Sequence, residues 1–329
     1  MAFTVNDAFL QFNADTVNLD PDRTSIARSS RDWLIEQING FPVKDDVFPN
    51  LFVERHIKFG SFARNVKIKE LDDVDLILCL HADNAYYRKD NAQPNKYKIY
   101  TTNAGHRLIE CSDNGVLNSR KVINAFVSSL KDIEQYKNAD IHRKLEAATL
   151  ELNSYEWVFD IVPAFHTVND FYLIPDGLGG WKATNPEVDQ KRLAFLNKKY
   201  GAINQLVRTL KYWNRERVSP NVGSYLFENF VLGFIESSSE LTQYVDVNMI
   251  RFWHHFKSSV YQPVLDPAGF QGNINDLTSD IMASLSKQAL EAHNKGIEAN
   301  TFEVTDKNNK AAISKWQEIF GTQFPSYGL

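Results

Sequence analysis

Two aspartates at the start of an apolar segment have the spacing of paired metal ligands. Asp73 and Asp75 flank Val74 and lead into the almost wholly apolar run Val74–Leu80, which is typical of a central strand covered on both faces. Because successive side chains of a strand point to opposite faces, the two carboxylates point the same way. They repel each other and raise each other's pKa unless a cation lies between them. A hard divalent cation such as Mg²⁺ suits these oxygen ligands and keeps positions free for phosphates.

A third aspartate, Asp160, lies centrally in a second apolar segment, Trp157–Val162. A carboxylate buried there without a partner would cost free energy, so we expect it to have one. Three carboxylates can bridge two metal ions about 3.5–4 Å apart, which is the arrangement of two-metal phosphoryl transfer. We therefore predict that Asp73, Asp75 and Asp160 are the catalytic residues and bind two Mg²⁺ ions, with Mn²⁺ as a substitute.

The pair Gly60–Ser61 precedes the first two aspartates by a short spacer. Glycine lets the backbone approach a phosphate closely, and backbone N–H groups and the serine hydroxyl donate hydrogen bonds to it. Alone, a Gly–Ser pair is usually an ordinary turn, and an Asp-x-Asp sequence is usually a solvated strand end. Their combination in this order, with a later strand aspartate, is more specific and predicts a phosphate-binding turn beside a metal site.

The run Phe59–Leu80, together with Phe159–Pro163, resembles the core of the polymerase-β-type nucleotidyltransferases. More narrowly, the chain is similar to the bacterial cyclic-oligonucleotide synthases that are related to cyclic GMP–AMP synthase and oligoadenylate synthase. The similarity covers nearly the whole chain, and further segments carry it: Ile174–Gly177, Trp181, Asn185–Pro186, Leu210–Asn214, Ser224–Glu228, Leu265–Pro267, Trp316, Phe320–Gly321 and Phe324–Pro325.

The resemblance implies roles for further residues. Asp160 would also help to activate the attacking hydroxyl. Gly60 and Ser61 would contact the donor triphosphate, whereas Lys211 and Ser224 would hold its terminal phosphates from the helical lobe, so that the active site is a cleft between two lobes.

One position departs from the family's pattern. Many bacterial members carry a Gly–Thr pair a few residues after the Gly–Ser, whereas this chain has Arg64–Asn65. The exact contacts of the phosphate turn therefore stay open, and Arg64 could itself reach a phosphate.

The strands and helices that must position these residues indicate an α+β fold. The first half of the chain is rich in strands, and the second half is helical. We expect residues 1–175 to form the nucleotidyltransferase core with an N-terminal spine helix, which Thr24 or Ser25 caps and Gly40 ends. Residues 176–329 would form an all-helical lobe. Strands are expected over 53–59, 74–80 and 157–162, with Pro163 ending the last, and helices over 187–217, 223–237, 246–260, 276–295 and 307–319.

The composition is that of an ordinary globular protein, with 43% hydrophobic residues, 23% charged residues and a formal net charge of -5. No bulk positive field attracts nucleic acid. Basic residues near the aspartates, Lys67 among them, could form a nucleic-acid stripe or could equally offset the aspartate charges. The N-terminus lacks the pattern of a signal peptide, and no apolar run approaches the ~20 residues that span a bilayer. We expect a cytoplasmic monomer without a membrane partner or a stable nucleic-acid partner.

The leading hypothesis is a template-independent synthase that joins nucleoside triphosphates into a cyclic di- or trinucleotide. The resemblance further implies an anti-phage role, in which the product reaches a nucleotide-sensing effector. One alternative is an RNA-directed nucleotidyltransferase for tailing or tRNA-end repair, or a linear oligoadenylate synthase; the acidic net charge disfavours a long RNA track. An alternative of another class is a catalytically silent nucleotide-binding module, against which the three aspartates count.

Overall fold

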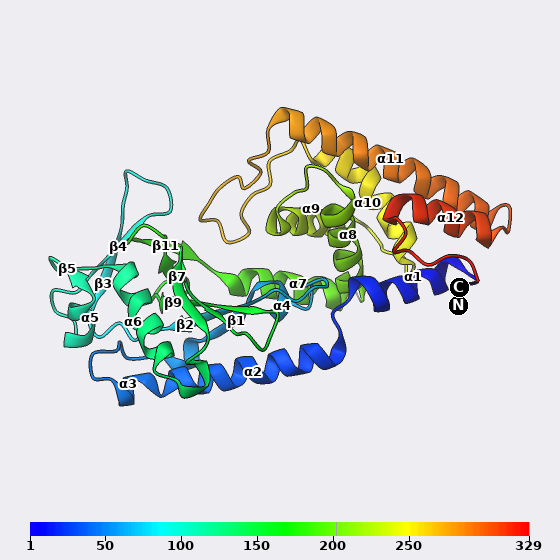
Figure 1. The fold of residues 1–329 in the computed structure, drawn as a ribbon. Coiled ribbons are helices and arrows are strands. Elements are labelled where there is room, and N and C mark those ends of the chain that lie inside the picture. The colour runs from blue at the N-terminus through cyan, green and yellow to red at the C-terminus, as the bar shows by residue number, and fades with distance from the viewer. Residues whose placement is uncertain (202, 329) are drawn as a thin grey trace.

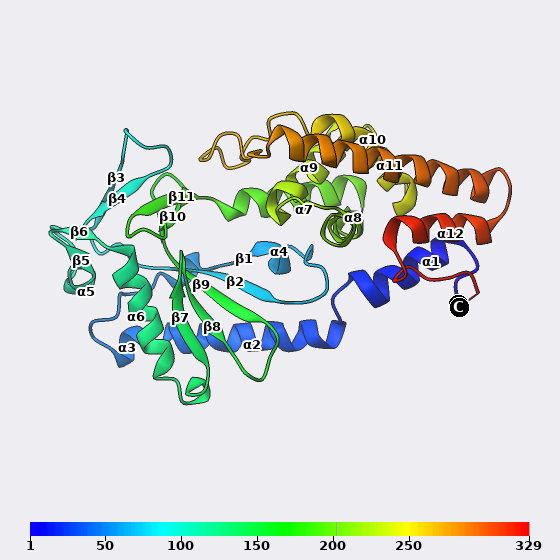
Figure 2. The same cartoon turned by 45° about the horizontal axis from the view of Figure 1, so that its top comes forward.

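The computed structural model describes residues 1–201 and 203–328. A part built on a mixed sheet lies beside a part built of helices, and the long helix α2, Pro21–Asn39, runs beneath the sheet (Figures 1 and 2). The two ends of the chain lie together at the far side of the helical part (Figure 1). The predicted α+β class is confirmed.

Within the described residues the strands form an 11-stranded sheet with the main order β1-β2-β9-β10-β11-β4-β6-β5. Strands β2 and β9 at its centre are parallel, and the other pairs are antiparallel. The strand bounds are β1 Ile57–Phe59, β2 Asp73–Cys79, β3 Tyr86–Lys89, β4 Tyr97–Tyr100, β5 Ser112–Asp113, β6 Val116–Leu117, β7 Asp140–Lys144, β8 Ala147–Glu151, β9 Val158–His166, β10 Tyr172–Pro175 and β11 Trp181–Thr184.

The two central strands present different chemistry on their two faces. On β2, Val74, Leu76 and Leu78 join an apolar core that also contains side chains of α2 and of α6, Ser119–Lys131. The alternating residues point to the opposite face, where Ile77 and Cys79 belong to a smaller apolar cluster. This second face carries the aspartates, so the large core fixes the strand while its other side remains available for chemistry.

The helical part has its own core, which the first residues of the chain share. Helix α1, Val5–Phe12, and a π-helical turn, Asn13–Val17, pack with the C-terminal residues, and Phe9 meets Trp316 at 4.9 Å between ring centroids. The other helices of this part are α7 Pro186–Tyr200, α8 Ile203–Arg217, α9 Ser224–Ser237, α10 Val245–Ser259, α11 Ser279–Val304 and α12 Asn309–Phe320. The chain therefore passes between the two parts twice, before α2 and after β11.

Short helices complete the sheet-containing part: α3 Phe41–Lys44, α4 Gly60–Ala63, α5 His106–Glu110 and two 3₁₀ turns, Val53–Arg55 and Glu134–Tyr136. Among the described residues, no helix combines the length and the apolar character that a bilayer crossing requires. The predicted lobe boundary near residue 175 falls between β10 and β11, so one strand of the sheet lies on its helical side.

Several predicted elements need correction at their ends. The spine helix begins earlier than predicted, because the Asp20 side chain accepts the Arg23 N–H at 2.8 Å and Pro21 occupies the first turn. The predicted strand over 53–59 is a 3₁₀ turn followed by the short β1. The predicted helix over 187–217 is two helices, because Gly201 ends α7 with a φ of 77° that L-residues rarely adopt; Ala202 lies outside the described residues.

Pro163 does not end its strand. The N–H of Val158 donates to Asp72 on the β2 side, so every second residue faces β2 and the nitrogen of Pro163 faces the other side. There β8 pairs with β9 only up to Ile161, and β10 pairs with it from Phe165. The missing N–H thus falls in the gap between two partner strands, where no ladder hydrogen bond is lost.

Candidate active site

Three aspartates from the two parallel central strands share one face of the sheet. Asp75 on β2 and Asp160 on β9 are direct register partners, and Asp73 precedes Asp75 by two residues on the same face. Burial, together with the neighbouring charges of Asp73 and Asp160, raises the pKa of Asp75 to about 7. Burial also raises the pKa of Asp73. The structure brings together the three residues predicted from the sequence, and the predicted mutual repulsion is present.

The glycine of the phosphate turn allows the chain to pass against this cluster. Gly60 directly follows β1 and has a φ of 74°. A Cβ atom at this position would lie 1.8 Å from Oδ2 of Asp75, so a side chain there would displace that carboxylate. Gly60 is therefore required both by its backbone conformation and by its closeness to Asp75. Ser61, the next residue, lines the cavity described below.

Two neighbours hold the outer aspartates. The Lys67 ammonium forms ion pairs with Asp72 and Asp73, which confirms that a basic residue of this stretch offsets the aspartate charges. The Thr149 hydroxyl on β8 donates to Oδ1 of Asp160 at 2.8 Å, so Asp160 has the partner that its buried strand position required. Sequence reasoning missed Thr149, because the register of β8 against β9 places it opposite Asp160.

The donor set fits divalent cations. Among the described residues, no three acidic, histidine or cysteine side chains already converge as a finished metal cage, and Lys67 and Thr149 contact two of the three carboxylates. Asp75 has neither partner, is largely buried and lies against the space that Gly60 leaves open. Three carboxylates that raise one another's pKa suit hard cations, which neutralise the repulsion and prefer oxygen.

A cavity of about 360 Å³ separates this face from the helical part. Its lining comes from both parts and includes the aspartates of β2, the phosphate turn and the start of α9: Phe59, Gly60, Ser61, Arg64, Lys67, Asp73, Asp75, Ala183, Thr184, Asn185, Pro186, Asp189, Ser224, Tyr225, Glu228, Asp266, Ala268 and Gln271. A neighbouring cavity of about 250 Å³ shares Ser61, Lys67 and Ser224 with it and adds Lys211. The predicted substrate-binding residues Gly60, Ser61 and Ser224 thus line the main cavity, and Lys211 lines the adjoining one.

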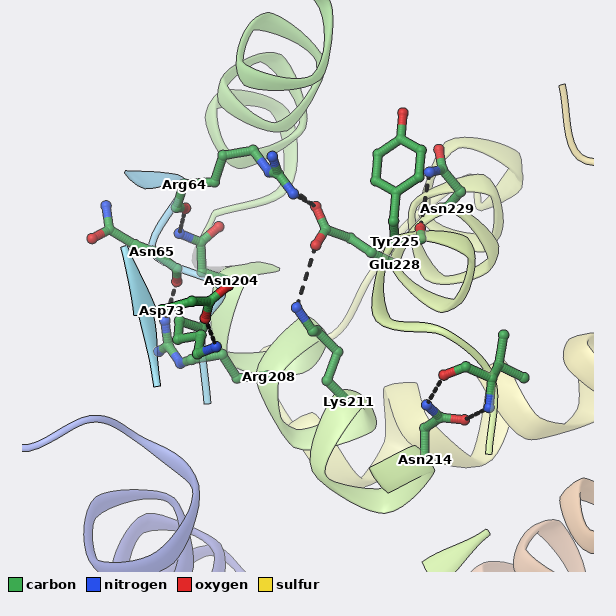
Figure 3. Close-up of polar contacts among 12 residues, drawn as sticks. Arg64, Asn65, Asp73, Asn204, Arg208, Lys211, Asn214, Tyr225, Glu228 and Asn229 are labelled. Atoms are coloured by element: carbon green, nitrogen blue, oxygen red, sulfur yellow. Dashed lines mark hydrogen bonds and ion pairs between the residues drawn. The ribbon is translucent and has the colours of Figure 1, made fainter. Parts of the chain in front are cut away.

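Lys211 does not point freely into the cleft. Its Nζ lies 3.4 Å from Oε2 of Glu228 on α9, and Oε1 of the same carboxylate accepts a hydrogen bond from Arg64 Nε at 3.1 Å and lies 2.9 Å from Arg64 Nη2 in an ion pair. Figure 3 shows Arg64 and Lys211 approaching Glu228 from opposite sides. All three side chains are buried, and burial lowers the pKa of Lys211. Sequence reasoning missed Glu228, although its position four residues after Ser224 indicates a shared helix face.

The end of the phosphate turn is tied to the helical part by a second residue. Arg208 on α8 donates to the carbonyl oxygen of Asn65 at 2.6 Å and to the side-chain oxygen of Asn18 at 2.7 Å. The Arg28 side chain of α2 also donates to Asn65, at 2.9 Å (Figure 3 shows Arg208 beneath Asn65). The Arg64–Asn65 pair, which departs from the family's pattern, therefore connects the turn to α8, α9 and α2.

Other polar groups of the cavity were not predicted as site residues. The Tyr225 hydroxyl lies 3.2 Å from Asp189 on α7, whose pKa burial raises. Asp266 accepts the backbone N–H groups of Phe270 and Gln271 at 2.8 and 3.0 Å, which fixes the loop that closes the cavity. These residues come from distant segments, so only the tertiary fold reveals that they meet.

Comparison with known proteins places this geometry in a family. No protein-family model matches the chain. Over 335 aligned residues it is 39% identical to a probable cyclic nucleotide synthase of Bacillus cereus strain VD146, and the alignment covers 99% of each chain.

Solved structures share the fold at low sequence identity. CdnC of E. coli MS115-1 in complex with ATP superimposes with a TM-score of 0.71 at 15% identity, over 98% of this chain and 99% of CdnC. Vibrio cholerae DncV with the linear intermediate pppA(3′,5′)pG superimposes with a TM-score of 0.67 at 10% identity, over 99% of this chain and 98% of DncV. The predicted polymerase-β-like architecture is therefore confirmed, and the full-length identity to the Bacillus cereus protein carries the assignment further. The chain belongs to the cyclic nucleotide synthases, a family of nucleotidyltransferases.

Proposed function

We propose that this protein joins nucleoside triphosphates into a cyclic di- or trinucleotide second messenger and releases pyrophosphate at each step. One observation carries the proposal: three aspartates on adjacent parallel strands share one face of the sheet, and two of them, Asp73 and Asp75, line a cavity whose opposite wall bears phosphate-binding side-chain types. Three clustered carboxylates that share, among the described residues, the single cation Lys67, together with a facing set of hydroxyl and cationic groups, suit a metal–triphosphate substrate.

Each residue has a defined task in this reaction. Asp73, Asp75 and Asp160 would hold two Mg²⁺ ions, which when bound polarise the donor α-phosphate and stabilise the charge of the departing pyrophosphate. Ser61 and Ser224 would donate hydrogen bonds to the triphosphate from the two walls, and Lys211 would bind the terminal phosphates. Asp160 would accept the proton of the attacking ribose hydroxyl, while Thr149 keeps its carboxylate in place. The ribose oxygen then forms the new P–O bond as pyrophosphate leaves.

Ring closure would use the same aspartates a second time. The linear product of the first step would rebind in the reverse orientation, so that its free hydroxyl meets its own triphosphate. DncV has been captured with a linear intermediate, which supports this sequence of events for a relative of the same fold. A cavity lined by both parts of the molecule encloses the reacting groups and supports repeated reaction at one site.

The product would act as a signal in anti-phage defence through a nucleotide-sensing effector. CdnC forms a complex with a HORMA protein, so a direct protein partner is a second way in which a relative of this fold associates with other proteins. The expectations of a monomer and of a cytoplasmic location stay predictions.

The test incubates the protein with the four labelled nucleoside triphosphates and Mg²⁺ or Mn²⁺, followed by phosphatase treatment, chromatography and mass determination. Asp73→Asn/Asp75→Asn removes two charges from the cluster. The matched control, Asp22→Asn/Asp280→Asn, makes the same two changes at exposed positions in the first turns of α2 and α11.

A phosphatase-resistant product that the control retains and the cluster variant loses would support the proposal and identify the bases. A product that phosphatase degrades would instead indicate a linear oligonucleotide synthase. Extension of an added RNA, without product in its absence, would indicate the RNA-directed alternative. Nucleotide binding without any product would contradict the proposal and indicate a silent module.

A further inference from the structure

A single buried carboxylate joins two cations from different parts of the molecule. Arg64 follows the phosphate turn, Lys211 lies on α8 and Glu228 lies on α9. Their side chains are 8%, 6% and 4% exposed. Figure 3 shows that both cations point at this one carboxylate. Burial of three charges is costly, and such a cluster is stable only when its geometry is good and each charge has a partner.

The cluster lies where the triphosphate would bind. Ser224 and Glu228 are four residues apart on α9 and so lie on one face of that helix. Both line the main cavity together with Ser61 and Arg64, and Lys211 lines the adjoining cavity with Ser61 and Ser224. A phosphate that reaches the two serines would therefore approach the same two cations that Glu228 now holds.

The charge balance of the cluster favours an incoming anion. Two cations share one carboxylate, which leaves one positive charge in excess, whereas the nearby Lys67 is already paired with Asp72 and Asp73. Asp189 lies near Arg64, and a negative charge on it would reduce this positive excess. However, the Tyr225 hydroxyl donates a hydrogen bond to Asp189, and burial raises the pKa of Asp189, which disfavours its charged form. Arg64 offers five N–H donors, and its contacts with Glu228 involve only Nε and Nη2, so the guanidinium can bind a phosphate oxygen as well.

We propose that Glu228 is a built-in stand-in for the triphosphate: in the free protein it holds Arg64 and Lys211 at the cleft, and the triphosphate competes with it for these two cations. Arg64 is then a triphosphate-binding residue, and Glu228 is a positioning residue that acts through it. This inference rests on the proposed function only in naming a nucleoside triphosphate as the ligand. Its consequence is that Glu228 protects the free protein against two unpaired buried cations and weakens triphosphate binding in return.

Glu228→Gln tests the competition, because glutamine keeps the size and one acceptor oxygen but removes the charge. The probe is inorganic tripolyphosphate in EDTA, so that neither metal binding nor catalysis contributes. We expect a lower Tm of the free variant and tripolyphosphate binding about ten-fold tighter than in the wild type, which corresponds to about 1.4 kcal/mol. Glu236→Gln is the matched control, because Glu236 lies on the same helix and pairs with an arginine, Arg192, outside the cleft. It should change Tm only slightly and leave binding unchanged.

Arg64→Gln provides the second variant and leaves Glu228 paired with Lys211. It should weaken tripolyphosphate binding about ten-fold, and in the double variant the gain from Glu228→Gln should shrink, because the two residues act on one another. In the complete reaction Glu228→Gln should lower KM for the nucleoside triphosphates without raising kcat.

The outcomes separate this inference from the proposed function. Equal or weaker binding by Glu228→Gln, with normal binding by the wild type, would overturn the stand-in role alone. A purely structural ion pair would lower Tm by the same amount with and without tripolyphosphate, and that result would also overturn it. If neither the wild type nor any variant bound tripolyphosphate in EDTA, the stand-in role would fail, whereas the proposed function would still be decided by product formation with Mg²⁺.

Discussion

The cleft has two walls, the sheet face that carries the aspartates and the helical part, and the two walls carry opposite excesses of charge. The sheet wall gathers three carboxylates whose mutual repulsion and burial raise the pKa of Asp75 to about 7. The helical wall and the phosphate turn gather two cations on one carboxylate, Glu228. On the sheet wall as the structure describes it, three carboxylates therefore share one cation, Lys67, whereas on the other wall two cations share one carboxylate.

This difference shows how the site can prefer a metal–triphosphate over either component. Divalent cations would neutralise the carboxylates of the sheet wall, and phosphates would neutralise the cations of the helical wall. A metal–triphosphate would therefore offset both excesses of charge at once. It also means that removal of a charge should change stability in opposite directions on the two walls. The following predictions test that opposition, beginning with the largest effect.

Asp75→Asn should reduce product formation at least about 10³-fold, because a metal ligand at the centre of the cluster is lost. The same change should raise Tm of the metal-free protein at pH 8. Burial raises the pKa of this carboxyl above its ordinary value of 3.8, so its charged form destabilises the folded state at that pH. Glu228→Gln, on the other wall, should lower Tm under identical conditions. If both substitutions shifted Tm in the same direction, the contrast between the walls would be wrong.

Gly60→Ala should reduce activity about 10²-fold, because the new Cβ lies within 1.8 Å of the Asp75 carboxylate and displaces it. Its φ of 74° adds strain of about 1–3 kcal/mol. Gly233→Ala is the matched control: Gly233 lies inside α9 with no atom near the new Cβ, so alanine should raise stability there by roughly 0.5–1 kcal/mol. Activity and thermal unfolding of both variants provide the measurement. An active Gly60→Ala would show that Asp75 tolerates movement.

Thr149→Val should lower kcat about ten-fold with little change in KM, because Asp160 loses a hydrogen bond that contributes about 1.5 kcal/mol. Thr101→Val controls for the loss of a buried threonine hydroxyl, since Thr101 bonds Ser112 outside the cavity at 2.8 Å. Steady-state kinetics of the two variants distinguish positioning from stability. Equal losses in both would assign the effect of Thr149 to stability alone.

The smallest expected effect is a pH dependence of stability that comes from His56, which contacts the end of β2. The Cys79 N–H at the end of β2 donates to Nδ1 of His56 at 3.0 Å, and burial lowers the pKa of this histidine to about 4. The unfolded chain takes up this proton near its ordinary value of 6.5, so stability should fall as pH falls from 6.5 towards 4. Denaturant unfolding should show that the free energy of unfolding of the wild type, relative to that of His56→Gln, falls by about 1 kcal/mol from pH 7.5 to pH 5.5. A constant difference would mean that the pKa of His56 is the same in the folded and the unfolded chain.

Local patterns predicted the sheet wall well. The period of two in a strand places Asp73 and Asp75 on one face without any knowledge of the partner strands, and an aspartate within an apolar run made Asp160 conspicuous. Pro163 shows the limit of such reasoning. Whether a proline ends its strand depends on which side of β9 its nitrogen faces and on where the pairing with β8 and β10 ends.

The helical wall was less predictable, because its chemistry depends on contacts between distant segments. Lys211 and Ser224 were identified only through the resemblance, and Glu228, which decides how Lys211 is held, lay unrecognised one turn further along α9. The last residues show the same limit. Tyr327 forms a bridge with Ala2 and the Gly328 N–H donates to the Ala2 carbonyl, a contact between the two chain ends that no local pattern indicates; Leu329 lies outside the described residues.

The double passage of the chain between its two parts has a mechanical consequence. Because α1 belongs to the helical core, the parts are joined by covalent links at two places, ahead of α2 and between β11 and α7. Between these links the segment before β2 adds a third connection, because Val66 and Ile68 are buried in the helical core and Arg64 pairs with Glu228. Any separation of the two walls would expose these apolar side chains and break this ion pair. The width of the cleft is therefore set by packing as well as by the covalent links.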